Sequence, residues 1–392
     1  MEAIYRSFSC GRLGVATEVL GVVSRAHALN VFENLSSDTS LLEEWVPGLM
    51  SVLLAWSAQP TTDLWRREVG RIERAASGGS DACAVPCVEL GLSIAGEYDY
   101  GYEPWNFRFA EPHTLSFDIW SVPSVISGTI SSDGKFMLKL ADGRLIHSAG
   151  NVLTDHANLN SFAFSEARVR IPNGTITILP GAAVSSEIIP PHAKVRFAST
   201  ESMGDFSAVL VDAFDLLARC SPRYAEWVSS VVRYVTPLSA PSGQLGSSSS
   251  PWECGLVALT HTPHSVAVAE MLVHEASHQI FFLAKRLGPM DDGKDDALYF
   301  SPMARQLRHI ERILLAYHAL GNIVLMYEDV ARFDSNQTVH CQKQIEKSAP
   351  KIIEMEKILS QTKSLTKIGD AIYEPLRKEV LTLFQSRSMS SA

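Results

Sequence analysis

The chain has 392 residues, with 34 Lys and Arg against 43 Asp and Glu, and therefore a formal net charge of −9. Because 46% of the residues are apolar and 20% are charged, the chain can bury a large core, which excludes wholesale disorder. The acidic balance argues against nucleic acid as a partner, and no apolar run reaches the roughly 20 residues that a membrane span needs. Scattered charges in residues 1–20 are atypical of a secretory signal. We therefore expect a soluble, cytoplasmic protein of enzyme size, in two or three structural units.

The cysteines indicate the same compartment. Six cysteines in a chain of this length are far too few for a disulfide scaffold, so we expect reduced thiols. Cys83 and Cys87 are four positions apart, but no second pair follows at zinc-finger spacing. We interpret both thiols as structural.

The patterning predicts an α+β protein in three regions. Residues 1–90 form a helical N-terminal region, in which apolar residues from Leu41 to Trp56 follow helical spacing. Residues 91–200 form a β-rich module, because short stretches alternate between apolar and polar residues and are separated by hairpin signals such as Asn173-Gly174. Residues 201–392 form a helical, metal-binding catalytic region.

Four segments of the last region bear on function. Apolar residues predict a helix over Phe206 to Cys220, and the segment from Tyr224 to Val235 continues in the same helical style. The Gly- and Ser-rich stretch from Ser239 to Pro251 is interpreted as a loop or lid. A second long helix is expected from about Met303 to Phe333.

The main chemical signal is the HExxH sequence that begins at His274. On a helix, His274 and His278 stand one turn apart on the same face, where two imidazoles can bind one divalent metal. Glu275 lies beside them and can contact a metal-bound water. The predicted helix has the apolar surroundings that a buried metal site needs, with Thr262-Pro263 at its start and Gly288-Pro289 at its end.

A metal site needs at least one further protein ligand. Within the expected second long helix, His318 lies in an otherwise apolar segment, so it is either a hydrogen-bonded core residue or a ligand. With an HExxH sequence forty residues upstream, we prefer the ligand. Glu311 shares the predicted helix face with His318, and Arg308 precedes Glu311 on the same stripe.

Three stretches resemble the HExxH-motif peptide-modification proteins, which act on ribosomally synthesised precursor peptides (RiPP biosynthesis). The run from Ser247 to Gln279 looks like their core. Tyr299 to Arg305 is similar to their Tyr-x-x-Pro-Trp-Arg segment, although Met303 replaces the tryptophan. Arg308 followed by Leu315 to Ala319 matches an Arg-then-Ala-x-His-Ala pattern, although His309 replaces a common proline. The resemblance covers roughly residues 200–335.

This resemblance implies a dioxygenase that depends on Fe(II) and 2-oxoglutarate and hydroxylates the β-carbon of a residue in a precursor peptide. His274, His278 and His318 would be the metal ligands, with Glu275 either a ligand or a group that orients one. The distal carboxylate of 2-oxoglutarate favours a guanidinium, which Arg308 or Arg305 would provide. Tyr299 and Ser301 would form hydrogen bonds with the cosubstrate or the substrate.

Two other interpretations remain open. In a zinc metallopeptidase, Glu275 would be the general base and Glu311 or His318 would complete a zinc site with His274 and His278. The residues after His278 lack the Gly and His of the extended metzincin pattern, which disfavours that subclass. The third interpretation is a binding module without catalysis that recognises a peptide through its β-rich part. The sequence predicts no oligomeric state.

Overall fold

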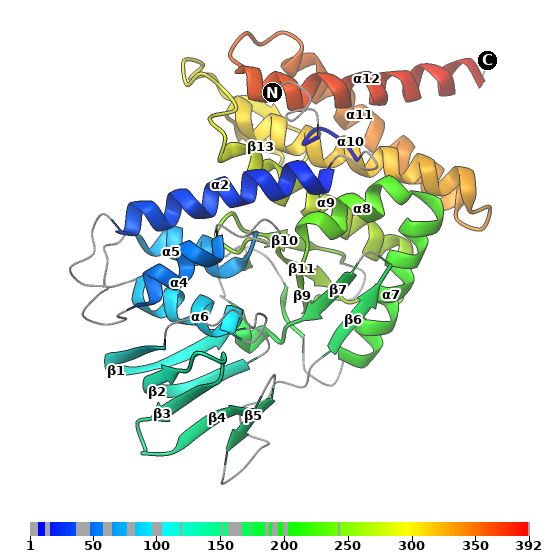
Figure 1. The fold of residues 1–392 in the computed structure, drawn as a ribbon. Coiled ribbons are helices and arrows are strands. Elements are labelled where there is room, and N and C mark those ends of the chain that lie inside the picture. The colour runs from blue at the N-terminus through cyan, green and yellow to red at the C-terminus, as the bar shows by residue number, and fades with distance from the viewer. Residues whose placement is uncertain are drawn as a thin grey trace.

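The computed structural model describes residues 7–11, 16–36, 48–57, 65–76, 83–95, 104–117, 120–149, 152–155, 167–172, 174–184, 188–189, 195–198, 203–241 and 244–390. These residues form a mixed α+β protein, as the sequence predicts (Figure 1). In the described part of the chain, no helix is both long and apolar enough to cross a membrane. All six cysteines are buried and none forms a disulfide.

The first sheet is an antiparallel meander that packs against the N-terminal helices. Its strands are β1 (Trp105–Phe117), β2 (Trp120–Ile130), β3 (Phe136–Leu140), β4 (Leu145–Ala149) and β5 (Val152–Asp155), in that spatial order. The helices before it are α2 (Ala16–Ser36), α4 (Leu49–Ser57), α5 (Arg67–Ala76) and α6 (Ala84–Ala95). Trp56 of α4 and Trp105 of β1 belong to the same buried cluster, so these helices and this sheet share one core.

The second sheet lies at the centre of the molecule. Its strands are β6 (Ala167–Ile171), β7 (Gly174–Ile178), β8 (Arg196–Phe197), β9 (Tyr234–Ser239), β10 (Ser247–Ser249) and β11 (Leu256–Thr260). Strand β9 runs parallel to β7 on one side and to β11 on the other, while β10 and β6 lie at the two ends and run antiparallel to their neighbours. Strand β11 is buried throughout, as expected of a central strand covered on both faces.

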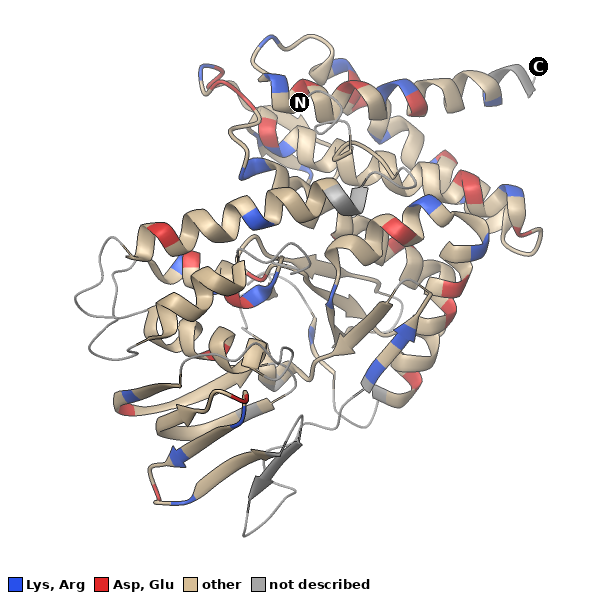
Figure 2. Cartoon of the chain, viewed as in Figure 1, with Lys and Arg blue, Asp and Glu red and all other residues tan. Residues whose placement is uncertain are grey.

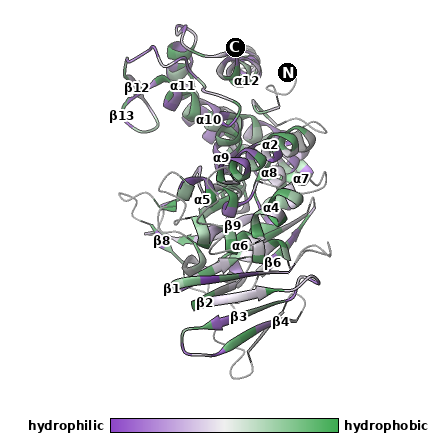
Figure 3. Ribbon diagram, turned by 60° about the vertical axis from the view of Figure 1, so that its left-hand side comes forward, coloured by the Kyte–Doolittle hydropathy of each residue, from purple (hydrophilic) through white to green (hydrophobic). Residues whose placement is uncertain are grey.

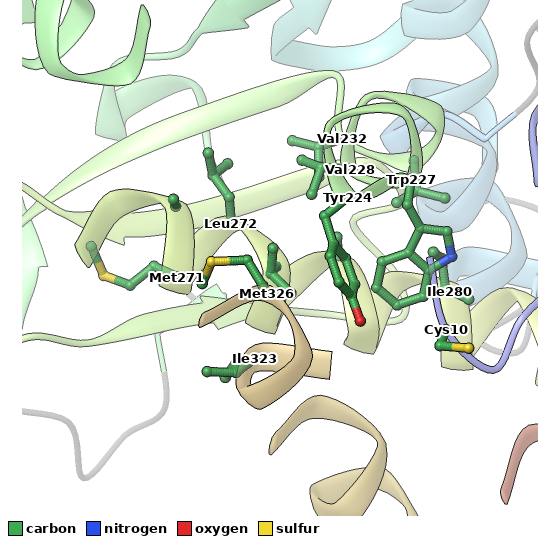
Figure 4. Packing of buried hydrophobic residues seen from close by; sticks show 14 of the residues in the cluster. Cys10, Tyr224, Trp227, Val228, Val232, Met271, Leu272, Ile280, Ile323 and Met326 are labelled. Carbon is green, nitrogen blue, oxygen red and sulfur yellow. The ribbon is translucent and has the colours of Figure 1, made fainter. Parts of the chain in front are cut away.

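Helices cover the second sheet and continue into a C-terminal bundle. They are α7 (Met203–Cys220), α8 (Pro222–Val231), α9 (Ser265–Lys285), α10 (Ile310–Phe333), α11 (Thr338–Leu359) and α12 (Lys367–Ser390). Helix α9 contacts α7, α8, α10 and strands β10 and β11. Figure 4 shows the resulting core, in which Leu272 and Ile280 of α9 lie among side chains of α8 and α10. Between α9 and α10 the chain forms a hairpin of β12 (Tyr299–Ser301) and β13 (Gln306–Arg308).

Several predicted elements are confirmed. Helix α7 (Met203–Cys220) contains the helix predicted over Phe206 to Cys220, and β6 and β7 form the predicted hairpin about Gly174. Trp56 lies in a helix, whereas Asn173 and the segment Leu41–Pro47 lie outside the described residues. The three expected regions are interleaved, because β6 and β7 belong to the sheet that supports the HExxH helix.

Three predictions are wrong. The segment from Tyr224 to Val235 is not one helix, because α8 ends at Val231 and Tyr234 and Val235 enter β9. The serine-rich stretch is not only a loop, since Ser247–Ser249 pairs with β11 as strand β10. The long helix does not begin near Met303 but at Ile310, because the preceding residues form the β12–β13 hairpin.

Helix α5 attaches the N-terminal helices to the second sheet through buried charges. Arg71 donates to Glu253 at 3.0 Å and to Glu89 at 3.3 Å, and Glu89 accepts from the backbone N–H of Ser116 at 2.6 Å. Figure 2 shows the acidic and basic residues that alternate along α5. Removing one partner from a buried pair leaves an uncompensated charge, so this network fixes how α5 sits on the loop that contains Glu253.

The close contact between α5 and the loop that contains Glu253 predicts the effect of a substitution on stability. A Cβ atom at Gly70 of α5 would lie 2.5 Å from the carbonyl oxygen of Trp252 and 2.9 Å from Sγ of Cys254. Gly70→Ala should therefore lower the free energy of unfolding by about 1–3 kcal/mol, measured by urea denaturation. Gly21→Ala, in the middle of α2 with no atom within 4 Å of its Cβ, is the matched control and should stabilise by about 1 kcal/mol. Equal effects at the two sites would contradict this packing.

Candidate metal centre

The HExxH sequence lies on the one open stripe of α9. This helix is apolar on most faces and buried along almost its whole length, as expected of a helix in the interior of a domain. Between Val266 and Ala284, the only half-exposed positions are Glu270, His274, His278 and Phe282, spaced four residues apart. Because residues four apart share a helix face, both histidines face the same opening.

The side chains of His274, Glu275 and His278 converge. One ligand atom from each lies within 4.8 Å of the other two, which is a spacing that a single metal ion can bridge. The imidazole rings of His274 and His278 meet edge to face with their centroids 4.6 Å apart. Burial, with a further contribution from the neighbouring His274, holds the pKa of His278 well below its usual range. A neutral imidazole is the form that binds metals.

Glu275 is held by the adjacent strand β10. Its side chain is 1% exposed, and its Oε2 accepts a hydrogen bond of 2.6 Å from the Ser249 hydroxyl. Its Oε1 lies 3.8 Å from Nε2 of His274. One carboxylate oxygen is therefore fixed by the sheet while the other faces the histidine.

Gln279 holds the loop after β10 against α9. Its amide oxygen accepts from the indole N–H of Trp65 at 3.0 Å and from the backbone N–H of Gly255 at 2.9 Å. Its amide nitrogen lies within 3.3–3.5 Å of the carbonyl oxygens of Ser250, Glu253 and Leu256. This fully buried amide thereby fixes the segment that carries Ser249 next to Glu275.

His318 lies in α10 and packs against the HExxH helix from the interior. Its ring is fully buried, with its centroid 6.0 Å from that of Phe281, and its Nε2 lies 2.8 Å from the carbonyl oxygen of Phe8. Its Nδ1 is buried and makes no hydrogen bond among the described residues, although backbone groups of Ser9 and Ser277 lie close enough to the ring to oppose the fall in its pKa. Burial lowers the pKa of His318 to about 4, so the imidazole is neutral. The structure does not bring His318 into the three-residue cluster, although it places it close by on the facing helix.

The other predicted site residues lie further out. Arg305 and Arg308 are exposed on the β12–β13 hairpin, not in the long helix where the sequence predicted them, so Arg308 does not share a helical stripe with His318. The Tyr299 hydroxyl donates to Asp295 at 2.8 Å, and Ser301 is buried and accepts from the backbone N–H of Ala304. Glu311 pairs with Lys285 at 2.7 Å, near the end of α9, and does not belong to the cluster.

Two residues that the sequence did not single out take part in the site. Ser249 lies in a serine run that carries no strand signal, and only its pairing with β11 brings it to Glu275. Arg312, in the first turn of α10, is close enough for its charge to contribute to lowering the pKa of His278. The sequence places Arg312 among the polar residues of the long helix but assigns it no role.

Comparison with the models of known protein families finds no match, and comparison with curated proteins finds none either.

The cluster predicts measurable metal binding. Titration of the metal-stripped protein with Co(II), followed by visible absorption, should give one site. His274→Ala or His278→Ala should weaken it by about 100-fold or more, since each removes a ligand. His264→Ala, at the exposed start of the same helix, is the control and should bind Co(II) like the unmodified protein. Unchanged affinity in His278→Ala would contradict the assignment.

Proposed function

We propose that this protein is a peptide hydroxylase that depends on Fe(II) and 2-oxoglutarate, with its metal on the open stripe of α9. The observation that carries the proposal is the convergence of His274, Glu275 and His278, with His318 on the facing helix. The ligand set would consist of imidazoles and would leave positions for a bidentate keto acid and for dioxygen.

The hydrogen bonding of His318 supports its role as the third ligand. A metal-binding histidine generally donates its second ring N–H to a carbonyl or carboxylate, which fixes its orientation. Here Nε2 of His318 faces the Phe8 carbonyl, which makes Nε2 the protonated nitrogen and leaves Nδ1 as a buried lone pair without a donor. An unpaired buried acceptor is costly, and a metal ion would satisfy it.

When bound, iron with 2-oxoglutarate supplies the oxidising chemistry: one oxygen atom of O₂ enters the peptide C–H bond and the other enters succinate, with release of CO₂. The residues of the chain do the positioning. His274 and His278 hold the metal on a rigid helix, and Ser249 keeps Glu275 fixed beside His274. A nearly buried Glu275 suits this orienting role better than that of a base that must reach solvent water.

Arg312 is the guanidinium that we assign to the distal carboxylate of 2-oxoglutarate. It is exposed in the first turn of α10, beside Glu311, which pairs with Lys285 at the end of α9, and its charge contributes to the low pKa of His278. Arg308 lies on the hairpin outside the cluster. A guanidinium fork is the donor best matched to a carboxylate.

Strand β10 offers a place for the peptide. It is the last strand of its sheet, and within the described ranges no other strand pairs with its outer edge. An extended peptide that adds to this edge would run past Ser249 and the adjacent Glu275.

The proposal is tested without knowledge of the peptide. Under anaerobic conditions, 2-oxoglutarate added to the Fe(II)-loaded protein should produce a visible charge-transfer band, because the keto acid binds the metal. Admission of air with ascorbate should then release succinate at a slow, uncoupled rate. His318→Gln, which retains an N–H donor for the Phe8 carbonyl, should remain folded yet lose the band. A zinc-loaded protein that shortens an unstructured peptide without oxygen dependence would refute the proposal.

Zinc peptidase chemistry is the second candidate, because Oε1 of Glu275 faces the histidines as a general base would. Glu275→Gln separates the two candidates, since Ser249 can still donate to the amide oxygen. A peptidase loses its base and all activity, whereas an oxygenase retains part of its succinate release.

We expect substitutions of Arg312 and Arg308 to have different effects on the binding of 2-oxoglutarate. Arg312→Gln should raise the 2-oxoglutarate concentration at half-saturation of the charge-transfer band by about 10- to 100-fold, the range expected for one charge-assisted contact. Arg308→Gln is the matched control and should leave it unchanged. If Arg308→Gln raised this concentration and Arg312→Gln did not, Arg308 of the hairpin would be the residue that binds 2-oxoglutarate.

A further inference from the structure

The β12–β13 hairpin exposes apolar side chains on its solvent face. Phe300 and Leu307 are direct cross-strand partners, so their side chains lie on the same face of the hairpin. They are 46% and 58% exposed, and Leu298 and Met303 beside them are 50% and 37% exposed. Figure 3 shows the hairpin projecting from the body of the molecule. A contiguous apolar group of this kind is typical of an interaction site.

The hairpin is also locally basic in an acidic protein. Arg305, at the turn, has a φ of 53°, and Arg308 ends β13. Both are exposed, and no carboxylate pairs with either among the described residues. In the acidic loop before β12, Asp292 pairs with Lys294, and Asp295 accepts a hydrogen bond from Tyr299 at the start of β12. Positive charge is therefore available along β13.

We infer that the solvent face of this hairpin and the edge of β13 bind an extended, acidic and apolar segment of the peptide substrate. Each strand has an outer edge that no third strand occupies in the described structure, so main-chain hydrogen bonds are available to an added strand. Phe300 and Leu307 would contact alternate apolar side chains, and Arg305 and Arg308 would pair with the carboxylates. Self-association is disfavoured, because a two-fold contact at this hairpin would bring four guanidiniums together.

The position of the hairpin links it to the metal centre. The chain passes from β13, which ends at Arg308, directly into α10, whose Glu311 pairs with Lys285 at the end of α9. A peptide held at the hairpin therefore lies near the C-terminal end of the HExxH helix. This inference rests on the proposed peptide substrate, but it concerns binding and needs no metal.

Binding is measured by fluorescence anisotropy in the presence of EDTA, so that failure of the metal chemistry cannot affect the result. The probe is a labelled twelve-residue peptide that alternates glutamate with valine or threonine, and its twin carries lysine in place of glutamate. The acidic probe should bind at least tenfold more tightly than the lysine twin. Phe300→Ser with Leu307→Ser should weaken it at least tenfold, and Arg305→Gln with Arg308→Gln should also remove most of its salt dependence.

Phe333→Ser with Val339→Ser is the matched control. Both residues are exposed, at 65% and 78%, and lie outside the hairpin, so the double variant should bind the acidic probe like the unmodified chain. Equal binding of the two probes, no binding at about 1 mM, or no effect of the hairpin substitutions would overturn the inference. So would a concentration-dependent dimer, detected by sedimentation velocity, that the Phe300 and Leu307 substitutions abolish.

Discussion

The amide of Gln279 is the contact on which the candidate centre depends. It is fully buried on α9, so each of its polar atoms needs a partner. Its oxygen takes the N–H groups of Trp65 and Gly255, and its nitrogen faces the carbonyl oxygens that follow β10. This one side chain therefore fixes the positions of the N-terminal part of the chain, the central sheet and the HExxH helix relative to one another. Ser249 reaches Glu275 because the strand that carries it has this fixed position.

A second polar network fixes α10 in the same way. Asn322 accepts from the buried hydroxyl of Tyr224 and donates to the carbonyl oxygens of Ser9 and His318. The backbone N–H of Leu376 donates to the Ser9 hydroxyl, so the segment Ser7–Gly11 connects α10 to α12. Buried networks that are fully paired are rigid, so this network fixes the position of α10 and of His318 against α9.

The sequence predicts the helix that carries the candidate ligands His274 and His278 better than it predicts the residues around them. Helix α9 and the spacing of His274 and His278 follow from periodicity, which is a local property. Strand β10 cannot be predicted from periodicity. Its three serines have no strand preference of their own, and they form a strand because they pair with β11. The hairpin before α10 was missed for the opposite reason, since helical apolar spacing continued upstream of Ile310 while cross-strand pairing determined the structure. Arg305 and Arg308 were therefore placed on the wrong kind of element.

His318 shows why an apolar context cannot distinguish a core histidine from a ligand. Both need burial, a neutral ring and one satisfied nitrogen, and His318 has all three. The distinction lies in the second nitrogen, Nδ1, which makes no hydrogen bond of its own among the described residues. The Phe8 carbonyl, more than three hundred positions away, places the proton on Nε2, and no local pattern contains that information. Phe8, Ser249, the HExxH turn and His318 come together only in the folded chain, so a metal ion bound there would link metal affinity to folding.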